Sequence, residues 1–206
     1  MLIDILRRFS YDGYFAAPAQ SFGTVTPNVQ DVYPQESILF EGVFQSYLSY
    51  WSRIYSAWCG SIRYKFSTSE PRTSTKTLMA YHVPDIISTD QPISTGLSVA
   101  DMNGFGAVKT NLSQDNALEI EVPYYSKFNM LLTRVGTAPG NYYRNGSVNI
   151  LSYDAAENPT PTPTLIESFV AAGEDFRFVY LRPPPVFNGG DSIFSPTEVF
   201  ITPAST

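Results

Sequence analysis

Short segments that alternate between apolar and polar side chains constrain the fold of this chain more than any other feature. In the segment 61–67, apolar residues alternate with Arg63 and Lys65, and in 117–122 they alternate with two glutamates. A period of two residues is typical of a β-strand with one buried face, because successive side chains of a strand point to opposite sides of its sheet. These segments therefore predict half-buried strands of an antiparallel sheet.

Other parts of the chain predict further strands, separated by loops rich in Pro, Ser and Thr. The predicted strands lie at 14–17, 38–44, 78–83, 128–135, 147–153 and 165–181. The main loops lie at 67–76, 85–115 and 154–164, and a turn near Gly173 interrupts the last strand. No series of helices alternates with the strands, which argues against a parallel α/β sheet and favours a β-sandwich.

One segment, 46–58, carries aromatic residues at helical spacing and predicts a short helix. Its apolar stripe consists of Tyr47, Tyr50, Trp51, Ile54, Tyr55 and Trp58. Residues at these intervals share one face of a helix, and we interpret the stripe as the face that packs on the core rather than as a ligand site. Gly60 follows where a left-handed helix cap is expected. The segment 1–9 is a second, shorter amphipathic stretch.

Charge and cysteine content exclude several classes of protein. The formal net charge is −6, and Arg7 and Arg8 are the only adjacent basic residues, which argues against a nucleic-acid-binding domain. No apolar run reaches the roughly 18 residues that predict a membrane span, and the N-terminal segment lacks the order of a secretory signal. Cys59 is the only cysteine, so no internal disulfide forms, which fits a reducing cytosol.

The surface is expected to be poor in charge. Charged residues make up 16% of the chain and aromatic residues 15%, whereas roughly 25% of an average soluble protein is charged. A neutral, aromatic surface suits burial against neighbouring subunits. A β-rich monomer has a similar composition, because strands are enriched in aromatic residues. Composition alone leaves both interpretations open.

The chain offers few residues for catalysis or metal binding. His82 is the only histidine and lies in an apolar strand, where a hydrogen-bonded core or edge position is a better interpretation than a catalytic base. Nothing in the sequence joins it to Cys59 as a nucleophilic pair. A zinc site is uncommon with one His and one Cys, and no phosphate or dinucleotide motif is present. We therefore predict no metal and no cofactor.

Three short motifs are interpreted as local structure. The segment 101–104 (DMNG) resembles part of a calcium loop but lacks the regular acidic spacing and the closing Glu, so a turn is expected there. Asn111 and Asn145 each begin an Asn-x-Ser pattern for glycosylation. Such a pattern has consequences only in a secreted chain.

Four motifs together resemble capsid proteins of picorna-like viruses, the order that includes dicistro-, ifla- and marnaviruses. They are the helix-to-strand passage WCGSIRYKF at 58–66, the strand and turn LMAYHVP at 78–84, EVPYYS at 121–126 and the proline-rich exit LRPPP at 181–185. Each motif is weak alone, but all four follow the order and spacing of the family from about 37 to 185. The chain is thereby identified as similar to this family over most of its length.

The resemblance implies an all-β, eight-stranded antiparallel jelly roll of two four-stranded sheets, B-I-D-G and C-H-E-F, with one short helix near 46–58. The expected strands are B at 14–17, C at 38–44, D at 61–67, E at 78–83, F at 117–122, G at 128–135, H at 147–153 and I at 165–181. A single domain is expected, with an N-terminal segment and first strand at 1–36, the jelly-roll core at 37–185 and a C-terminal extension at 186–206.

The resemblance also implies a function without turnover of a substrate. The chain is expected to be a major capsid protein that assembles with sister capsid proteins and with copies of itself, in the host cytoplasm, into an icosahedral virion around a positive-strand RNA genome. The segment 2–8 (LIDILRR) resembles the one preceding the first strand of the subunit around the fivefold axes. A long basic arm is missing before it, so little or no direct RNA contact is expected. The host receptor is unknown.

Two other functions compete with this one on the same architecture. A lectin-like, carbohydrate-binding jelly roll would use exposed Tyr and Trp as ligand platforms. A cupin-like enzyme would need several metal-binding histidines, and His82 alone argues strongly against it. Particle formation distinguishes the capsid interpretation from both.

One motif in the last strand implies chemistry. In insect-infecting and some marine relatives, an Asp-Asp-Phe motif near this strand is proposed to promote autolytic cleavage of a capsid precursor. Here the corresponding residues are Glu174, Asp175 and Phe176, with Glu in place of the first Asp. A carboxylate acting through water is a possible general base, and two clustered carboxylates are expected to raise the pKa of one another. The alternative interpretation is a polar turn.

Overall fold

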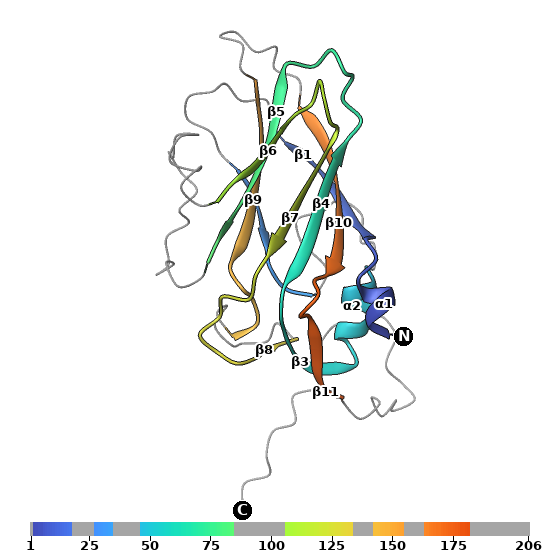
Figure 1. Ribbon diagram of the computed structural model, residues 1–206, viewed down its shortest axis with the longest axis vertical. Coiled ribbons are helices and arrows are strands. Elements are labelled where there is room, and N and C mark those ends of the chain that lie inside the picture. The colour runs from blue at the N-terminus through green and yellow to red at the C-terminus, as the bar shows by residue number, and fades with distance from the viewer. Residues whose placement is uncertain are drawn as a thin grey trace, which may run out of the picture.

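Two four-stranded antiparallel sheets face each other across one hydrophobic core (Figure 1). The computed structural model describes residues 2–17, 27–34, 46–84, 106–133, 142–154 and 163–181. The first sheet has the order β1 (Ser10–Ala17), β10 (Thr164–Ala172), β4 (Ile62–Thr68), β7 (Ala117–Val122). The second has the order β2 (Asn28–Asp31), β9 (Ser147–Asp154), β5 (Lys76–Val83), β6 (Val108–Asn111). A third, smaller sheet has the order β11 (Arg177–Leu181), β3 (Tyr55–Cys59), β8 (Leu131–Leu132), and the helices are α1 (Leu2–Leu6) and α2 (Tyr47–Ser52).

The two large sheets confirm the predicted jelly roll. The order β1-β10-β4-β7 corresponds to B-I-D-G, and the order β2-β9-β5-β6 corresponds to C-H-E-F. Every pairing within the two sheets is antiparallel. Within the described ranges, neither helix has the length and apolar character needed to cross a membrane.

The assignment of strand F is wrong. The strand predicted as F is β7, which pairs with β4 from Ile62↔Val122 to Ser67↔Ala117 and therefore takes place G. Place F belongs to β6, which pairs with β5 and lies in the region predicted as a loop. Its sequence, VKTN, is mostly exposed, so this edge strand lacks the apolar alternation that would have revealed it.

Three other predicted strands differ in place or extent. Place C is taken by β2, and the predicted strand at 38–44 lies outside the described residues. Of the predicted strand 128–135, the structure describes residues up to 133, and only Leu131–Leu132 form a strand, in the third sheet. The predicted strand 165–181 is two strands, β10 and β11, which belong to different sheets. The chain changes sheets at the turn 173–176.

The helix is shorter than predicted, and its aromatic stripe is not its core face. Helix α2 begins after Ser46, whose Oγ accepts a hydrogen bond from the Ser49 backbone N at 3.2 Å, and it ends at Ser52. Tyr47 and Tyr50 are 46% and 50% exposed, and the buried residues of α2 are Leu48, Ser49 and Ser52. The rest of the predicted helix is β3, because pairing with β11 and β8 overrides the local spacing.

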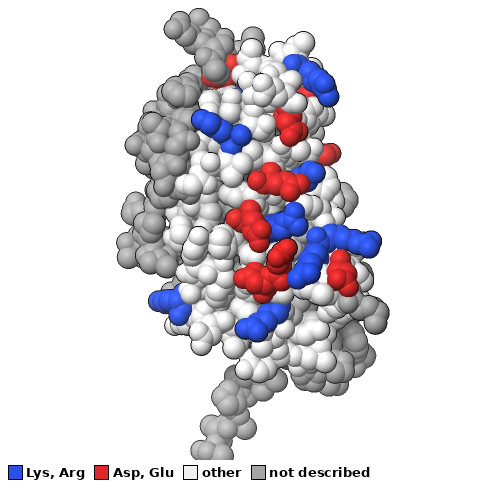
Figure 2. All heavy atoms as spheres, in the orientation of Figure 1, with Lys and Arg blue, Asp and Glu red and all other residues white. Residues whose placement is uncertain are grey.

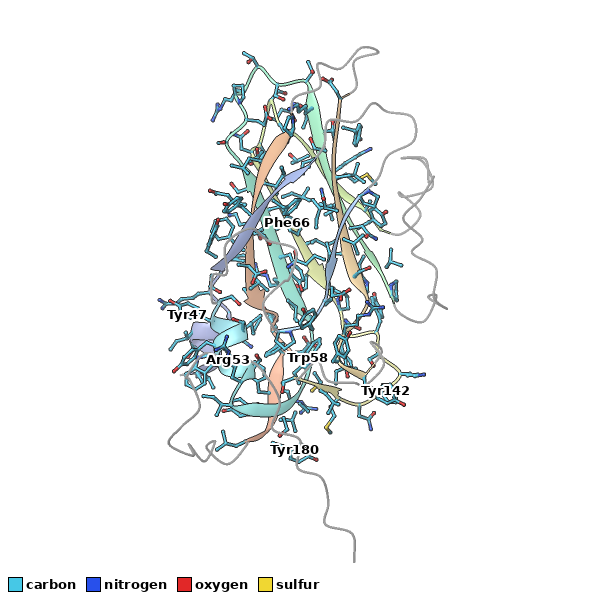
Figure 3. The ribbon with its side chains drawn as sticks, turned by 180° about the vertical axis from the view of Figure 1, so that it is seen from behind. Tyr47, Arg53, Trp58, Phe66, Tyr142 and Tyr180 are labelled. Atoms are coloured by element: carbon cyan, nitrogen blue, oxygen red, sulfur yellow. The ribbon has the colours of Figure 1, made fainter. Side chains whose placement is uncertain are left out.

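The inward faces of both large sheets form the main core. Its largest fully buried side chains include Trp58, Tyr64 and Phe66. Figure 3 shows Phe66 near the middle of the sandwich and Trp58 close to the end that carries the third sheet. The alternation predicted for 61–67 is confirmed, because β4 buries Ile62, Tyr64 and Phe66 and leaves the residues between them partly exposed.

The outward faces of the two sheets differ in chemistry. On the first sheet, β4 and β7 present Arg63, Lys65, Glu119 and Glu121, which we call the charged face. Figure 2 shows basic and acidic side chains interleaved over these strands. The second sheet instead has an outer apolar cluster, made of Met79, Tyr81, Val83, Leu151 and Tyr153.

Candidate functional site

The turn 173–176 joins β10 to β11 and packs directly on the corner between β3 and β4. The Gly173 backbone N donates to the Ser61 backbone O at 2.9 Å. A Cβ on Gly173 would collide with the Ser61 side chain, and one on Gly60 would collide with the backbone of Asp175. Gly60 also has a φ of +98°, so the left-handed glycine predicted there is correct, although it joins two strands rather than capping a helix.

Asp175 is held by Ser61 through two hydrogen bonds. Its Oδ1 accepts the backbone N–H of Ser61 at 2.8 Å and also lies within hydrogen-bond distance of the Ser61 hydroxyl. These donors stabilise the charged form, so the hydroxyl and then the backbone N–H hold the pKa of Asp175 below its usual value of 3.8. The predicted rise in pKa is therefore wrong for Asp175, because hydrogen bonding outweighs its partial burial.

The Ser61 hydroxyl also contacts a second carboxylate. Its Oγ lies 2.7 Å from Oε1 of Glu121, which comes from β7. Three separate segments thus meet at one hydroxyl: the β3–β4 corner, β7 and the β10–β11 turn. Sequence reasoning missed Ser61 and Glu121, because β7 was assigned to the other sheet. Glu121 does lie at a polar position of the alternation, but only the β4–β7 register brings it to Ser61.

Glu174 and Phe176 have different surroundings from Asp175. Glu174 is exposed, and its backbone O accepts a hydrogen bond from Arg7 at 2.8 Å, which ties the turn to the segment after α1. Phe176 is 3% exposed and packs against Trp58, with ring centroids 5.9 Å apart, and against Phe178 at 4.9 Å. Phe176 therefore anchors the turn in the core.

An open hollow of about 510 Å³ adjoins the turn. It is lined by Ser61, Arg63, Glu121, Pro123, Glu174 and Asp175. Three carboxylates and one guanidinium offer both hydrogen-bond acceptors and donors, which suits the amide groups of a peptide. A carboxylate that stays ionised beside an open hollow is able to accept a proton from a water molecule.

His82 and Cys59 have separate structural roles. His82 is 8% exposed, its Nε2 lies 2.8 Å from the Asn145 backbone O, and its ring stacks on Tyr125. The prediction of a hydrogen-bonded core histidine is confirmed. Cys59 is buried, and its sulfur accepts a hydrogen bond from Arg177 at 3.1 Å.

The Asn-x-Ser patterns are also part of the local structure. Asn145 is 3% exposed, donates from Nδ2 to the Pro123 backbone O at 2.6 Å and accepts from the Tyr125 backbone N at 2.9 Å. Asn111 accepts from the Ser113 backbone N at 3.0 Å within a turn. The predicted turn 101–104 lies outside the described residues. Among the described ranges, no three His, Cys, Asp or Glu side chains gather as a metal site would require.

Comparison with known proteins gives one consistent result. A family model described as CRPV capsid protein like matches residues 8–191. Among solved structures, the chain is similar to a chain from an expanded equine rhinitis A virus particle, with a TM-score of 0.68 and 16% identity over 90% of this chain and 81% of the other. A chain of a marine algae virus of the order Picornavirales gives 0.65 and 16% identity over 88% and 75%.

A third structure, the Israel acute paralysis virus pentamer, gives a TM-score of 0.58 and 19% identity, over 95% of this chain and 82% of the other. No curated protein sequence matches the chain. At such low identity the solved structures share the fold, whereas the family model matches most of the sequence.

Proposed function

Because the chain belongs to the family of CRPV-like capsid proteins, we propose that it lies around the fivefold axes of an icosahedral shell and contributes to cleavage of a capsid precursor. It is a structural protein of a virion, and its partners are other capsid proteins and copies of itself. The match over residues 8–191 carries the structural assignment, whereas the fivefold position and the cleavage role are proposals. The carbohydrate-binding alternative has no support, since the matching family and structures are those of capsids.

The described surface supports a role in assembly. Ten large hydrophobic side chains are exposed: Ile5, Tyr47, Tyr50, Val108, Tyr125, Leu132, Tyr142, Leu165, Tyr180 and Leu181. Tyr180 and Leu181 are 65% and 68% exposed at the end of β11, in the region where Figure 3 labels Tyr142 and Tyr180. Exposed aromatic and aliphatic side chains are typical of surfaces that neighbouring subunits cover.

The proposed position and surroundings in the virion follow from the N-terminal segment and the charge pattern. Helix α1 lies directly before β1 and contacts α2 and β10, as expected of an ordered lead-in to the first strand. The charged face mixes both signs, which favours protein neighbours over the phosphates of RNA. We therefore assign this chain little direct RNA contact. Its one cysteine, Cys59, forms no internal disulfide, which fits the proposed assembly in the reducing cytoplasm of the host cell.

The proposed contribution to cleavage uses Asp175, with Glu174 and Phe176 in the same turn. The reaction needs only water: its oxygen bonds to the scissile carbonyl carbon, the C–N bond breaks, and the amine leaves with a proton. Asp175 accepts the proton of the attacking water and later returns a proton to the amine. Support comes from its hydrogen-bonded, ionised carboxylate beside the open hollow and from the anchoring of Phe176 in the core.

The test is Asp175→Asn in the capsid precursor, produced together with the sister capsid proteins. This change keeps the size of the side chain and removes its charge. We expect particles to assemble with the precursor uncleaved, measured by gel electrophoresis of purified particles. Glu119→Gln is the matched control, because Glu119 is on the charged face but does not line the hollow. Normal processing in Asp175→Asn particles would remove the cleavage role and leave the structural role intact.

A further inference from the structure

We propose that Glu121, and not Glu174, is the second carboxylate of the cleavage site, and that Ser61 is the positioning residue that couples it to Asp175. This inference rests on the cleavage role proposed for Asp175. The motif in the sequence pairs Glu174 with Asp175 because they are adjacent. The structure pairs Asp175 with Glu121 through one shared hydroxyl, although 54 positions separate the two residues in the chain.

Asp175, Glu121 and the Ser61 hydroxyl together lack one proton for both of their hydrogen bonds to form at the same time. The Ser61 hydroxyl has a single hydrogen, but its oxygen lies at hydrogen-bond distance from both Asp175 and Glu121. When both carboxylates are ionised, the hydroxyl donates to one of them and presents only lone pairs to the other. A proton taken up by Asp175 completes both hydrogen bonds at once.

This arrangement gives a proton taken from water at the turn a connected set of hydrogen bonds. When Asp175 accepts the proton of an attacking water, it donates to Ser61 Oγ, and the Ser61 hydroxyl turns its own hydrogen to Glu121. The proton is therefore shared among three groups until the leaving amine takes it, and no further reactant is needed. Replacing the Glu121 carboxylate with a neutral amide leaves a weaker acceptor for the Ser61 hydrogen, so the hydroxyl donates to Asp175 instead and weakens Asp175 as a base.

The other charged groups near the turn have different contacts, so Glu121 is the group that serves as the second carboxylate. Arg63 lines the same hollow from β4, but its guanidinium is 3.5 Å from Glu119 and stacks over the Phe9 ring at 4.9 Å. Arg7, from the segment after α1, binds the backbone O of Glu174. Glu174 thus contributes a backbone contact that holds the turn.

The backbone at this site leaves space for the Ser61 hydroxyl that the two carboxylates share. Gly173 has no Cβ where the Ser61 side chain approaches, and a Cβ there would also meet Oε1 of Glu121 at 2.8 Å. Ser61 is 5% exposed, so solvent competes little for its hydroxyl. Both features hold the three groups together before any substrate binds.

The experiment compares Ser61→Ala, Glu121→Gln and Glu174→Gln with Asp175→Asn in assembled particles, and follows the fraction of cleaved precursor against time and pH. We expect Glu121→Gln to slow cleavage about 100-fold, a typical loss for an acid–base group, and Glu174→Gln to cleave within about threefold of the unchanged protein. Rates are normalised to assembled particles, and Glu119→Gln again serves as the control.

Ser61→Ala is expected to shift the pH profile of cleavage, a change that a purely structural role of Ser61 would not produce. Loss of the hydroxyl removes the main cause of the lowered pKa of Asp175, so the acid limb of the pH profile is expected to move to higher pH. An unmoved limb would overturn the positioning role. Normal cleavage in Glu121→Gln together with a block in Glu174→Gln would overturn the pairing while leaving the cleavage role of Asp175. Normal cleavage in Asp175→Asn would reject the cleavage role itself, and this inference with it.

Discussion

The two large sheets of the jelly roll bury their inner faces in the same core, but their outer faces differ in charge and in exposure to solvent. On the first sheet, Lys65 and Glu119 lie outward and remain 37% and 48% exposed. On the second sheet, Met79, Tyr81 and Leu151 point away from the main core and are 0% exposed. The sandwich therefore has one open, charged outer face, on the first sheet, and one covered, apolar outer face, on the second.

This difference explains why the strands of the two sheets have different patterns of apolar and polar residues in the sequence. A strand with one solvated face alternates between apolar and polar residues, as β4 and β7 do. A strand buried on both faces reads as a continuous apolar run, and β5 is buried at seven of its eight positions. Alternation of apolar and polar residues thus identifies the strands of the charged face directly. The apolar runs of the second sheet look like those of any other buried segment.

Exchanging the chemistry of the two outer faces should have the largest effect. Met79→Lys places an unpaired charge in the outer apolar cluster, which should cost about 3–5 kcal/mol and disrupt folding or assembly. Lys65→Met is the matched exchange on the charged face and should change stability by about 0.5 kcal/mol or less. Chemical denaturation of both variants measures the difference. Similar losses in the two variants would show that the outer faces are not distinct.

A second comparison lies at the end of the sandwich, between the two tryptophans. Trp58 is fully buried on β3, and Trp51 packs on the core from α2 while partly exposed. Trp58→Ala should cost about 3–5 kcal/mol, and Trp51→Ala about 1–2 kcal/mol because less area is lost. Free energies of unfolding test this order. An equal cost would mean that α2 packs as tightly as β3.

The third prediction concerns pH at the edge of the charged face. The pKa of Asp175 is lower in the folded chain than in the unfolded chain, so its contribution to stability is complete above pH about 4 and is lost as the pH falls through the folded pKa. Asp175→Asn should therefore flatten the acid limb of a plot of unfolding free energy against pH. The contribution is small, because the side chain is exposed. An unchanged acid limb would contradict the hydrogen bonds from Ser61.

The smallest effect is expected from the ion pairs of the charged face. Glu119 lies 3.4 Å from Lys65 and 3.5 Å from Arg63, but all three side chains remain partly exposed to solvent. Glu119→Ala should cost about 0.5 kcal/mol, and the cost should vanish in about 1 M salt, where charges are screened. A cost that persists at high salt would indicate packing by Glu119 rather than charge.

Much of the architecture could be predicted from local patterns, and the errors have physical causes. Alternation located β4 and β7, and the apolar run located β5. Strand β6 was missed because an exposed edge strand has no buried face to create a pattern. The helix was extended into β3 because the spacing of Tyr55 and Trp58 fits a helix locally, while their hydrogen bonds come from strands distant in sequence.

The site was predictable only in part, for a similar reason. The motif at 173–176 identified Asp175 and its turn, because those residues are contiguous. Ser61 and Glu121 reach the same point only through the register of β4 with β7 and the packing of Gly60 against the turn. No local pattern encodes such a register, and the assignment of β7 to place F, in the other sheet, concealed it.

The most direct test of the structural role is electron microscopy of material produced from this chain together with its sister capsid proteins. We expect closed icosahedral particles whose density contains this jelly roll, with exposed residues such as Tyr180 and Leu181 covered by neighbouring subunits. Particles that form without this chain, or a chain that stays a soluble monomer beside its partners, would contradict it.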